Sequence, residues 1–298
     1  MNSVTKIFKV AGRKVRGSLL RIDATSCTFR NCDDEVTIAC DNEGVPVTEC
    51  HSIEEFELAD NLIGYPMPIE CVEGTEFNAR EFRSKLEYCM LAMDFESTRY
   101  HLATVNWEDD KLVATDGRRM HIQHAGLAED KKTMERRQRL IRAKTCDIVL
   151  ECMKQFKDDI LRVYFVGDEV VFSGLFWSVR SSLYAGNFPK CWRNVIPSDD
   201  DLVETETVAV KQLREYCKDA IRRSGLENKV ESSKLTRSEK KRFERIIPTV
   251  IFGGVKLNAE YVQDAVSNVD EVRIVPKVAK SGNSACRIGD CVMMPLAK

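Results

Sequence analysis

The chain has 298 residues, a length that predicts two or three domains. Hydrophobic residues make up 43% of it and charged residues 31%, which is an ordinary soluble composition able to bury a core. The formal net charge of −2 argues against a general polyanion binder, although a basic face opposed by an acidic one is compatible with it.

The cysteines and the first six residues indicate the cellular compartment in which the protein is expected. None of the 12 cysteines forms a Cys-x-x-Cys pair, and their spacings fit no zinc template. Met1 to Lys6 contains no apolar signal core, and no run approaches the ~18 apolar residues of a membrane helix. We therefore expect free thiols, many of them buried, in a reducing cytoplasm. A disulfide-rich secreted protein would need a signal that this stretch lacks.

Residues 1–72 are predicted to be mostly strands. Alternating apolar residues occur in Lys6–Val10, Ser18–Ile22 and Glu35–Cys40, and glycine or asparagine punctuates them. No long amphipathic helix is evident. This region is either a shortened first domain or a separate β element.

Two helices are predicted in residues 73–200. The first spans Phe77 to Phe95, with Asn78 as its N-cap and apolar residues at three- and four-residue spacing. The second, Lys144 to Phe156, carries Cys146, Val149, Leu150 and Met153 on one face. Between them, the charged stretch Glu129–Arg142 predicts a solvated loop or an exposed helical turn.

Strands are predicted around both helices. Alternation from Tyr100 to Ala114, the turn Thr115-Asp116-Gly117 and renewed alternation to Ile122 predict a β-hairpin. After the second helix, alternation or continuous apolar runs predict the strands Leu161–Val166, Val170–Phe172 and Trp177–Tyr184.

The acidic segment Pro197–Asp201 predicts a linker at a domain boundary. A strand at Thr205–Val210 and a helix at Lys211–Ser224 follow, and Gly225 is a natural helix stop. The end of the chain predicts three elements, namely a helix with Asn258 as its N-cap, Asn258–Val269, and closing strands at Val272–Val275 and Cys291–Leu296.

No catalytic constellation is evident. His121 and His124 lie three residues apart, but no matched cysteine or carboxylate set accompanies them, so no metal site is predicted. The chain has no phosphate-binding glycine loop and no hydrolase or zinc-protease motif. We expect no cofactor and no bond chemistry, and an enzyme with an unrecognised site is the alternative.

Several segments, in the right order, resemble one family. Ala114–Met120, reading ATDGRRM, is similar to the central segment of the bacterial sliding clamp, the β subunit of DNA polymerase III. Four further segments resemble that family in chain order: Arg99–Leu102, Asn187–Pro189 with Val195–Pro197, Leu257–Val262, and Val292–Leu296. The resemblance covers roughly residues 75 to 298 and weakens between about 225 and 250, where family members have two strands that this sequence does not show.

The resemblance implies an α+β DNA-clamp fold, with repeated clamp domains whose helices line a ring and whose antiparallel sheets lie outside. It divides the chain into a shortened or divergent N-terminal β region, 1–72, a middle clamp domain, 73–200, and a C-terminal clamp domain, 201–298.

The implied function is that of a non-catalytic processivity factor. Such a protein encircles duplex DNA without sequence preference and tethers a replicative polymerase. Basic residues on pore-lining helices would attract phosphate through a salt-dependent interaction. The residues that the resemblance and the helix faces suggest for DNA contact are Arg80, Arg83, Lys85, Arg99, Tyr100, Lys211, Arg214, Lys218 and Arg222.

The resemblance also implies a groove between the middle and last domains for short hydrophobic peptides of partner proteins. Its walls would be Leu102, Thr115, Gly117, Arg118, Arg119, Met120, Pro189, Val195, Val292, Met294, Pro295 and Leu296. Flexible thioethers and aliphatic side chains suit adaptable peptide binding. Arg118 replaces the usual histidine of the family, which predicts an altered peptide preference.

The implied partners are the polymerase catalytic subunit, a clamp loader, repair proteins and further copies of the chain. A head-to-tail dimer is favoured over a trimer, because the family forms dimers. The implied location is the cytoplasm, in association with the nucleoid. The second hypothesis is a degenerate clamp-like adaptor that binds partner peptides without closing into a ring.

Overall fold

The computed structural model describes residues 5–10, 13–23, 26–31, 34–39, 75–95, 97–125, 138–174, 177–233, 246–267, 269, 271–280 and 284–296. These residues belong to two compact units. Unit 1 draws on Met1–Val113 and Gln123–Phe188, and unit 2 on Ala114–Ile122 and Pro189–Lys298.

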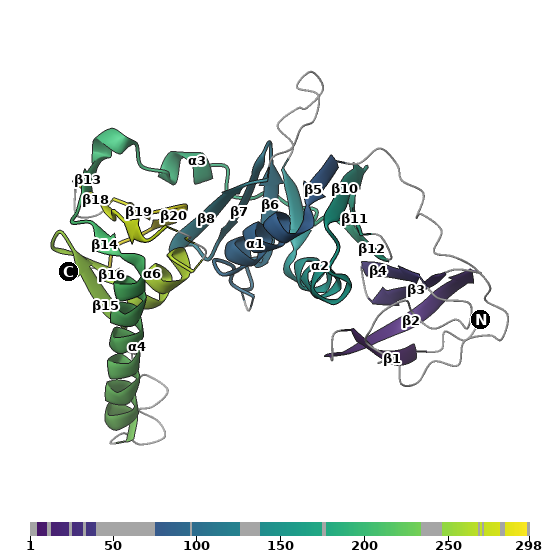
Figure 1. Cartoon of the computed structure of the whole chain (residues 1–298), viewed down its shortest axis with the longest axis horizontal. Coiled ribbons are helices and arrows are strands. Elements are labelled where there is room, and N and C mark those ends of the chain that lie inside the picture. The colour runs from purple at the N-terminus through teal and green to yellow at the C-terminus, as the bar shows by residue number, and fades with distance from the viewer. Residues whose placement is uncertain are drawn as a thin grey trace. The chain divides into compact units, whose positions relative to one another are not determined.

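In the middle of the chain, one order of elements, β-α-β-β-β, occurs twice (Figure 1). The first run is β5 (Thr75–Asn78), α1 (Ala79–Met90), β6 (Thr104–Glu108), β7 (Lys111–Thr115) and β8 (Arg119–His124), with a short 3-10 helix, η1 (Tyr100–Ala103), before β6. The second run is β9 (Arg139–Arg142), α2 (Ala143–Phe156), β10 (Ile160–Val166), β11 (Glu169–Ser173) and β12 (Trp177–Ser182). The predicted succession of helices and strands is confirmed.

The two runs interlock within unit 1, because the strand that opens each run pairs with a strand of the other. β5 pairs with β10 of the second run, and β9 pairs with β6 of the first, in both cases antiparallel. The helices α1 and α2 contact each other and lie side by side in Figure 1. Each half of the unit is therefore completed by one strand from the other half.

Local sequence explains both helices of unit 1. The Asn78 side chain accepts a hydrogen bond from the Glu81 amide at 3.0 Å, which confirms the predicted N-cap. Helix α1 ends at Met90, earlier than predicted. Helix α2 agrees with the prediction within one residue, and its C-cap, Lys157, adopts a left-handed conformation with φ of 52°.

Aromatic side chains fill the core under α1. The ring of Phe82 lies 5.5 Å from the ring of Trp107 and 6.2 Å from that of Phe172, measured between centroids. All three side chains are buried. These aromatic contacts join α1 to β6 of the first run and to β11 of the second, so the two runs share one core.

Four strands precede this repeat, and only their backbone is described. They are β1 (Thr5–Val10), β2 (Arg13–Asp23), β3 (Ser26–Asn31) and β4 (Asp34–Ala39). Each pairs antiparallel with the next, and β4 pairs with β12. Three of these strands were predicted and β3 was not. Residues 40–74 lie outside the described residues.

Unit 2 contains one long helix and several short strands. Its elements after the hairpin are α3 (Trp192–Val195), η2 (Asp199–Asp201), β13 (Leu202–Glu204), β14 (Val208–Ala209), α4 (Val210–Ser233), β15 (Thr249–Phe252), β16 (Val255–Asn258), α6 (Ala259–Ala265), β17 (Arg273–Ile274), β18 (Lys277–Ala279), β19 (Cys286–Ile288) and β20 (Cys291–Met293). The strands β13, β18, β19 and β20 are neighbours in that order, and β20 pairs with β8. The core lies between α4, α6 and these strands.

Several predicted elements of unit 2 were wrong in their bounds. Helix α4 continues through Gly225 to Ser233, because a single exposed glycine costs a helix only about 1 kcal/mol. Of the predicted strand Thr205–Val210 only Val208–Ala209 is a strand, β14, and the strand just before it, β13, was not predicted. Helix α6 is shorter than predicted, although Asn258 caps it by accepting a hydrogen bond from the Glu260 amide at 2.9 Å.

The charged stretch Glu129–Arg142 is described only from Gln138 onward, where it forms strand β9 rather than the predicted loop or helical turn. The seven cysteines whose side chains are described are free thiols, and all except Cys191 are buried. No helix in the described part of the chain is long and apolar enough to cross a membrane.

Candidate functional site

The turn between β7 and β8 is a rigid, internally bonded structure. Gly117 has φ of 87°, a left-handed conformation that favours glycine. The Asp116 carboxylate accepts hydrogen bonds from the amides of Arg118 and Arg119 at 2.8 and 2.9 Å, and the Gly117 amide donates to the Thr115 hydroxyl at 3.0 Å. The predicted Thr-Asp-Gly turn is confirmed, and its shape comes from these short-range bonds.

The end of the chain packs against this turn inside unit 2. Strand β20 pairs with β8, with Val292 opposite Met120. Beyond β20, the Met294 amide donates to the Arg118 carbonyl at 2.8 Å, and the Leu296 amide donates to the Lys256 carbonyl at 2.9 Å. Two segments far apart in the sequence, both predicted to form the peptide groove, are therefore neighbours.

Arg119 is held by partners within unit 2. Its guanidinium forms ion pairs with Asp116, at 3.2 Å, and with Asp264 of α6. It also lies over the ring of Tyr261, 4.3 Å from the centroid, and its side chain is only 10% exposed. Burial and the nearby Asp116 charge raise the pKa of Tyr261. Arg119 thus fastens the turn to α6, a role different from that of an open pocket wall.

The predicted groove residues differ in exposure. Met294 and Val195 are exposed, Pro189, Pro295 and Leu296 are partly buried, and Met120 and Val292 are buried. Leu102 belongs to unit 1, where it is buried, and the other predicted groove residues belong to unit 2. The exposed Met294 follows two residues after Val292, which is buried and lies opposite the buried Met120, so an exposed methionine lies close in the chain to a buried apolar pair.

The predicted DNA contacts of unit 1 lie on α1 and just before β6. Arg80, Arg99 and Tyr100 are exposed. Arg83 is 3.7 Å from Glu87, and Lys85 is 2.5 Å from Glu81, each one helical turn away. Exposed ion pairs of this kind are weak, so they compete little with a phosphate.

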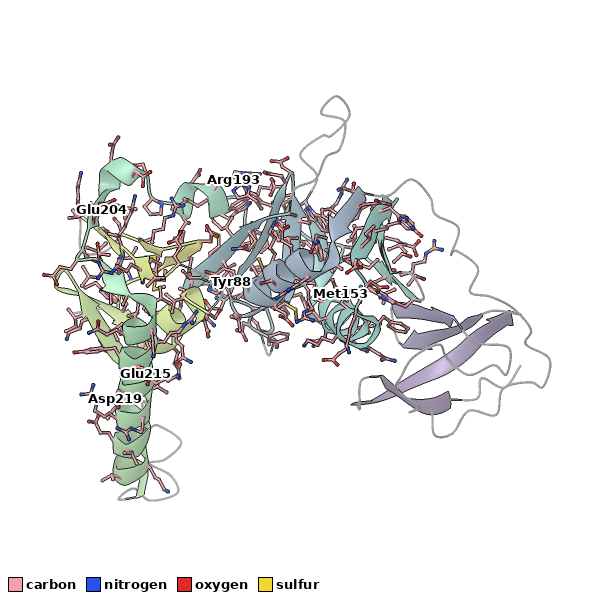
Figure 2. The ribbon with its side chains drawn as sticks, viewed as in Figure 1. Tyr88, Met153, Arg193, Glu204, Glu215 and Asp219 are labelled. Carbon is pink, nitrogen blue, oxygen red and sulfur yellow. The ribbon has the colours of Figure 1, made fainter. Side chains whose placement is uncertain are left out.

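The predicted DNA contacts of unit 2 lie on α4, and one of them, Arg214, also bonds within the unit. The Arg214 guanidinium donates to the carbonyl of Val266 at 2.6 Å and to that of Val269 at 3.4 Å, which caps the end of α6. These bonds engage the Arg214 guanidinium within unit 2, and its contact with DNA stays a prediction. Lys211 is exposed, and Lys218 and Arg222 pair with acidic residues of the same helix, Glu215 and Asp219 (Figure 2).

The described residues offer little for catalysis. No three histidine, cysteine, aspartate or glutamate side chains among them gather as metal ligands. Burial raises the pKa of the Cys217 thiol to about 12 and also raises that of Cys286, so neither is an activated nucleophile near neutral pH. His121 is buried and His124 is exposed, so the two side chains do not face the same surroundings.

Sequence reasoning missed Tyr261 and Asp264. They lie three residues apart on α6, after the predicted N-cap Asn258, so their shared helix face was readable. Their contact with Arg119 could not be predicted, because Asp264 and Arg119 are 145 residues apart in the chain and no local pattern indicates that they pair.

No protein-family model matches the chain, and no curated protein matches it. Solved structures do match. The DNA polymerase sliding clamp of Bacillus subtilis has a TM-score of 0.65 at 13% identity, over 95% of this chain and 91% of that chain. Caulobacter crescentus pol III beta gives a TM-score of 0.63 at 16% identity, over 94% and 91%. A putative DNA polymerase III beta subunit from Eubacterium rectale gives 0.62 at 15%, over 92% and 90%.

These neighbours share a fold with the chain at identities too low to carry more than the fold. The chain has the sliding-clamp fold, an α+β fold with antiparallel sheets. The fold class predicted from the sequence is confirmed.

Proposed function

We propose that the chain is a clamp-type processivity factor that encircles duplex DNA and tethers a replicative DNA polymerase. The observation that carries this proposal is the match to DNA polymerase III β subunits, which extends over nine-tenths or more of both chains for the neighbours named above. A ring holds DNA by topology, so it needs neither a tight grip nor bond chemistry. The chain would therefore be an accessory subunit and not an enzyme.

DNA would be attracted by basic residues of unit 1 and α4, with Tyr100 beside Arg99. Arg80, Arg83, Lys85, Arg99 and Tyr100 are supported by their position on α1 and before β6, and Lys211, Lys218 and Arg222 by their exposure on α4. Screened contacts of a few basic side chains with phosphate weaken steeply with salt and permit sliding.

Partner proteins would bind through short hydrophobic peptides at the surface around Met294. The pairing of Val292 with Met120 and the bond from the Met294 amide to the Arg118 carbonyl support this surface, and methionine adapts its shape to different ligands. The polymerase, a clamp loader and repair proteins are the partners in this proposal. The protein would act in the cytoplasm, in association with the nucleoid.

The test of this site replaces Met294 by aspartate. We expect the affinity for a fluorescent peptide that carries the hydrophobic motif of a clamp partner to fall about thirtyfold or more, because a charge would replace an apolar contact of ~2 kcal/mol. Fluorescence anisotropy measures the affinity. Val272→Asp is the matched control, since Val272 is an exposed apolar residue of unit 2 outside the proposed site. Equal affinity of the folded Met294 variant and the control would remove this surface from the proposal.

The second candidate function is an adaptor that binds partner peptides without closing into a ring. One observation favours it. In unit 1 the strand before α2, β9, pairs with β6, and β6 pairs in turn with β7. In unit 2 the strand before α6, β16, has β15 as its one strand partner among the described residues. No described strand lies between α4 and β15. Among the described residues, this half of unit 2 therefore shows fewer strands than its counterpart in unit 1. The assembly state of the protein distinguishes the two candidates.

A further inference from the structure

Unit 2 contains a groove of about 980 Å³ that the proposed function does not use. One wall is formed by residues 203–206, at the end of β13, and the other by residues 250–253 of β15 and its turn. The first turns of α4 and the end of β18 complete it. The volume is at the upper end of the range of about 300–1,000 Å³ seen for small-ligand sites.

The two walls are edges of strands. Consecutive residues, rather than every second residue, line the groove on both sides. Because successive side chains of a strand point to opposite faces, a lining of consecutive residues indicates that the groove runs along the edges. In the described part of the chain β13 is the last strand of its sheet, and β15 is one of only two strands in its own.

The backbone groups of β15 alternate in direction, and those of Ile251 face the groove side. The Ala259 amide donates to the Pro248 carbonyl, and the flanks of the Gly253-Gly254 turn, Phe252 and Val255, are paired. In an antiparallel pair, every second residue bonds across to its partner. This parity directs the amide and carbonyl of Ile251 away from β16, and neither has a hydrogen-bond partner among the described residues.

The same reasoning applies to β13. The Thr205 amide donates to the Pro276 carbonyl at 2.9 Å, and the Lys280 amide donates to the Asp201 carbonyl at 3.0 Å. These bonds use the odd-numbered residues of the strand, so the backbone groups of Glu204 point away from β18. Figure 2 labels Glu204 where β13 ends. Both walls therefore present backbone donors and acceptors of the kind that pair with an added strand.

The side chains around the groove define the chemistry of a ligand. Val203, Tyr216 and Ile251 are 46%, 62% and 60% exposed, which is unusual for large apolar residues that lie close together. Two carboxylates, Glu204 and Glu206, and one cation, Lys280, line the groove, and Glu204 lies 3.6 Å from Lys277. Three aspartates just before β13, Asp199 to Asp201, add negative charge beside it, and Lys277 and Arg287 lie near Asp199. Apolar contacts with an acidic rim suit a peptide that carries both apolar and basic residues.

We propose that this groove binds an extended peptide segment of a partner protein, which adds as a strand to the free edge of β15. Its backbone pairs with the amide and carbonyl of Ile251, its alternate apolar side chains pack on Tyr216 and Ile251, and a lysine or arginine meets Glu204 and Glu206. This mode, strand addition, obtains affinity from main-chain bonds and specificity from alternate side chains. The groove is a site separate from the surface around Met294 and does not depend on the clamp proposal.

The test selects binders from a displayed library of random peptides against the full chain, then measures their affinities by anisotropy. We expect one class of binders with alternating apolar residues and at least one lysine or arginine. Their affinity should fall about tenfold or more in Ile251→Glu and stay unchanged in Met294→Asp and in the exposed control Val272→Glu. Exchange of the Ile251 amide with solvent deuterium should slow when such a peptide binds.

Three results would overturn the proposal. The first is a set of binders that all keep their affinity for Ile251→Glu, or no binders at all. The second is a groove-dependent class that is acidic, which contradicts the chemistry assigned to Glu204 and Glu206. The third is a molar mass that rises with protein concentration in the wild type and not in Ile251→Glu, which would assign the groove to a second copy of the chain. If Ile251→Glu does not fold, Glu204→Lys with Glu206→Lys replaces it, and unchanged affinity for the basic peptides then contradicts the proposal.

Discussion

At the scale of single residues, the turn beside the proposed peptide site depends on Gly117. Its φ of 87° strains any residue with a Cβ, although an added Cβ would meet no atom within 4 Å. We expect Gly117→Ala to lower the free energy of unfolding by about 1–2 kcal/mol, the cost of a left-handed conformation. Gly225→Ala is the matched control, because Gly225 lies in α4 with equally open surroundings, and it should raise stability by about 0.5–1 kcal/mol. Urea unfolding measures both, and shifts of equal sign would contradict this explanation.

Arg118 and Arg119 are adjacent and carry the same charge, so a comparison of the two shows what the ion pairs of Arg119 contribute to stability. Arg119 is paired with Asp116 and Asp264 in a largely buried setting, whereas Arg118 is exposed. We expect Arg119→Met to lower the free energy of unfolding by about 1–3 kcal/mol, because two carboxylates lose their partner. Arg118→Met should change it by less than about 0.5 kcal/mol. Thermal unfolding of the two variants checks this, and equal stability would mean that the ion pairs contribute nothing.

Residues were predictable from the sequence where their partners are near in the chain. The Asp116 turn and both asparagine N-caps involve bonds across two or three residues, and all three were predicted. The contacts of Arg119 with Asp264 and of Arg214 with the end of α6 were not, since they depend on how distant helices pack. The same limit explains why the sequence did not show that Arg214, a basic residue on a helix, bonds to the end of α6.

At the scale of elements, existence and type were predicted better than bounds. Helix α4 passes through Gly225, and its extension is supported by Asn228, whose side-chain amide exchanges two hydrogen bonds with the backbone of Ile246, at 3.0 and 2.7 Å. The predicted strand Thr205–Val210 began in the break between β13 and β14, because that break carries no glycine or proline to mark it.

The prediction for DNA binding rests on two residues of helix α1 and on Arg99, which lies just before η1. Neutralising Arg80, Arg83 and Arg99 together to glutamine should weaken binding to a short duplex and reduce the slope of log K against log salt by about 0.9 for each phosphate that the variant no longer neutralises. The matched control neutralises three cations of unit 1 that lie on strands, Lys111, Arg162 and Arg180, and should leave the slope near that of the wild type, because the proposal puts the sheets on the side away from DNA. Fluorescence anisotropy across a salt series measures both. Unchanged binding of the first variant at low salt would mean that these residues do not face DNA.

At the scale of the whole molecule, the fold persists although only 13–16% of residues are shared with the solved clamps. The chain shows the order β-α-β-β-β twice, with buried apolar faces. The first strand of each run pairs with a strand of the other run. This pattern is readable from residues 75 onward. The division into domains at 1–72, 73–200 and 201–298 stays a prediction, because the compact units interleave the chain differently.

The most direct test of the central claim is the molar mass of the full chain by light scattering, across a range of concentrations and without DNA. A processivity ring predicts a constant mass of two chains, or of three, down to low concentration, because ring closure buries both ends of every copy. The mass of a single chain at every concentration would contradict the ring and favour the adaptor, whose peptide-binding surface needs no second copy.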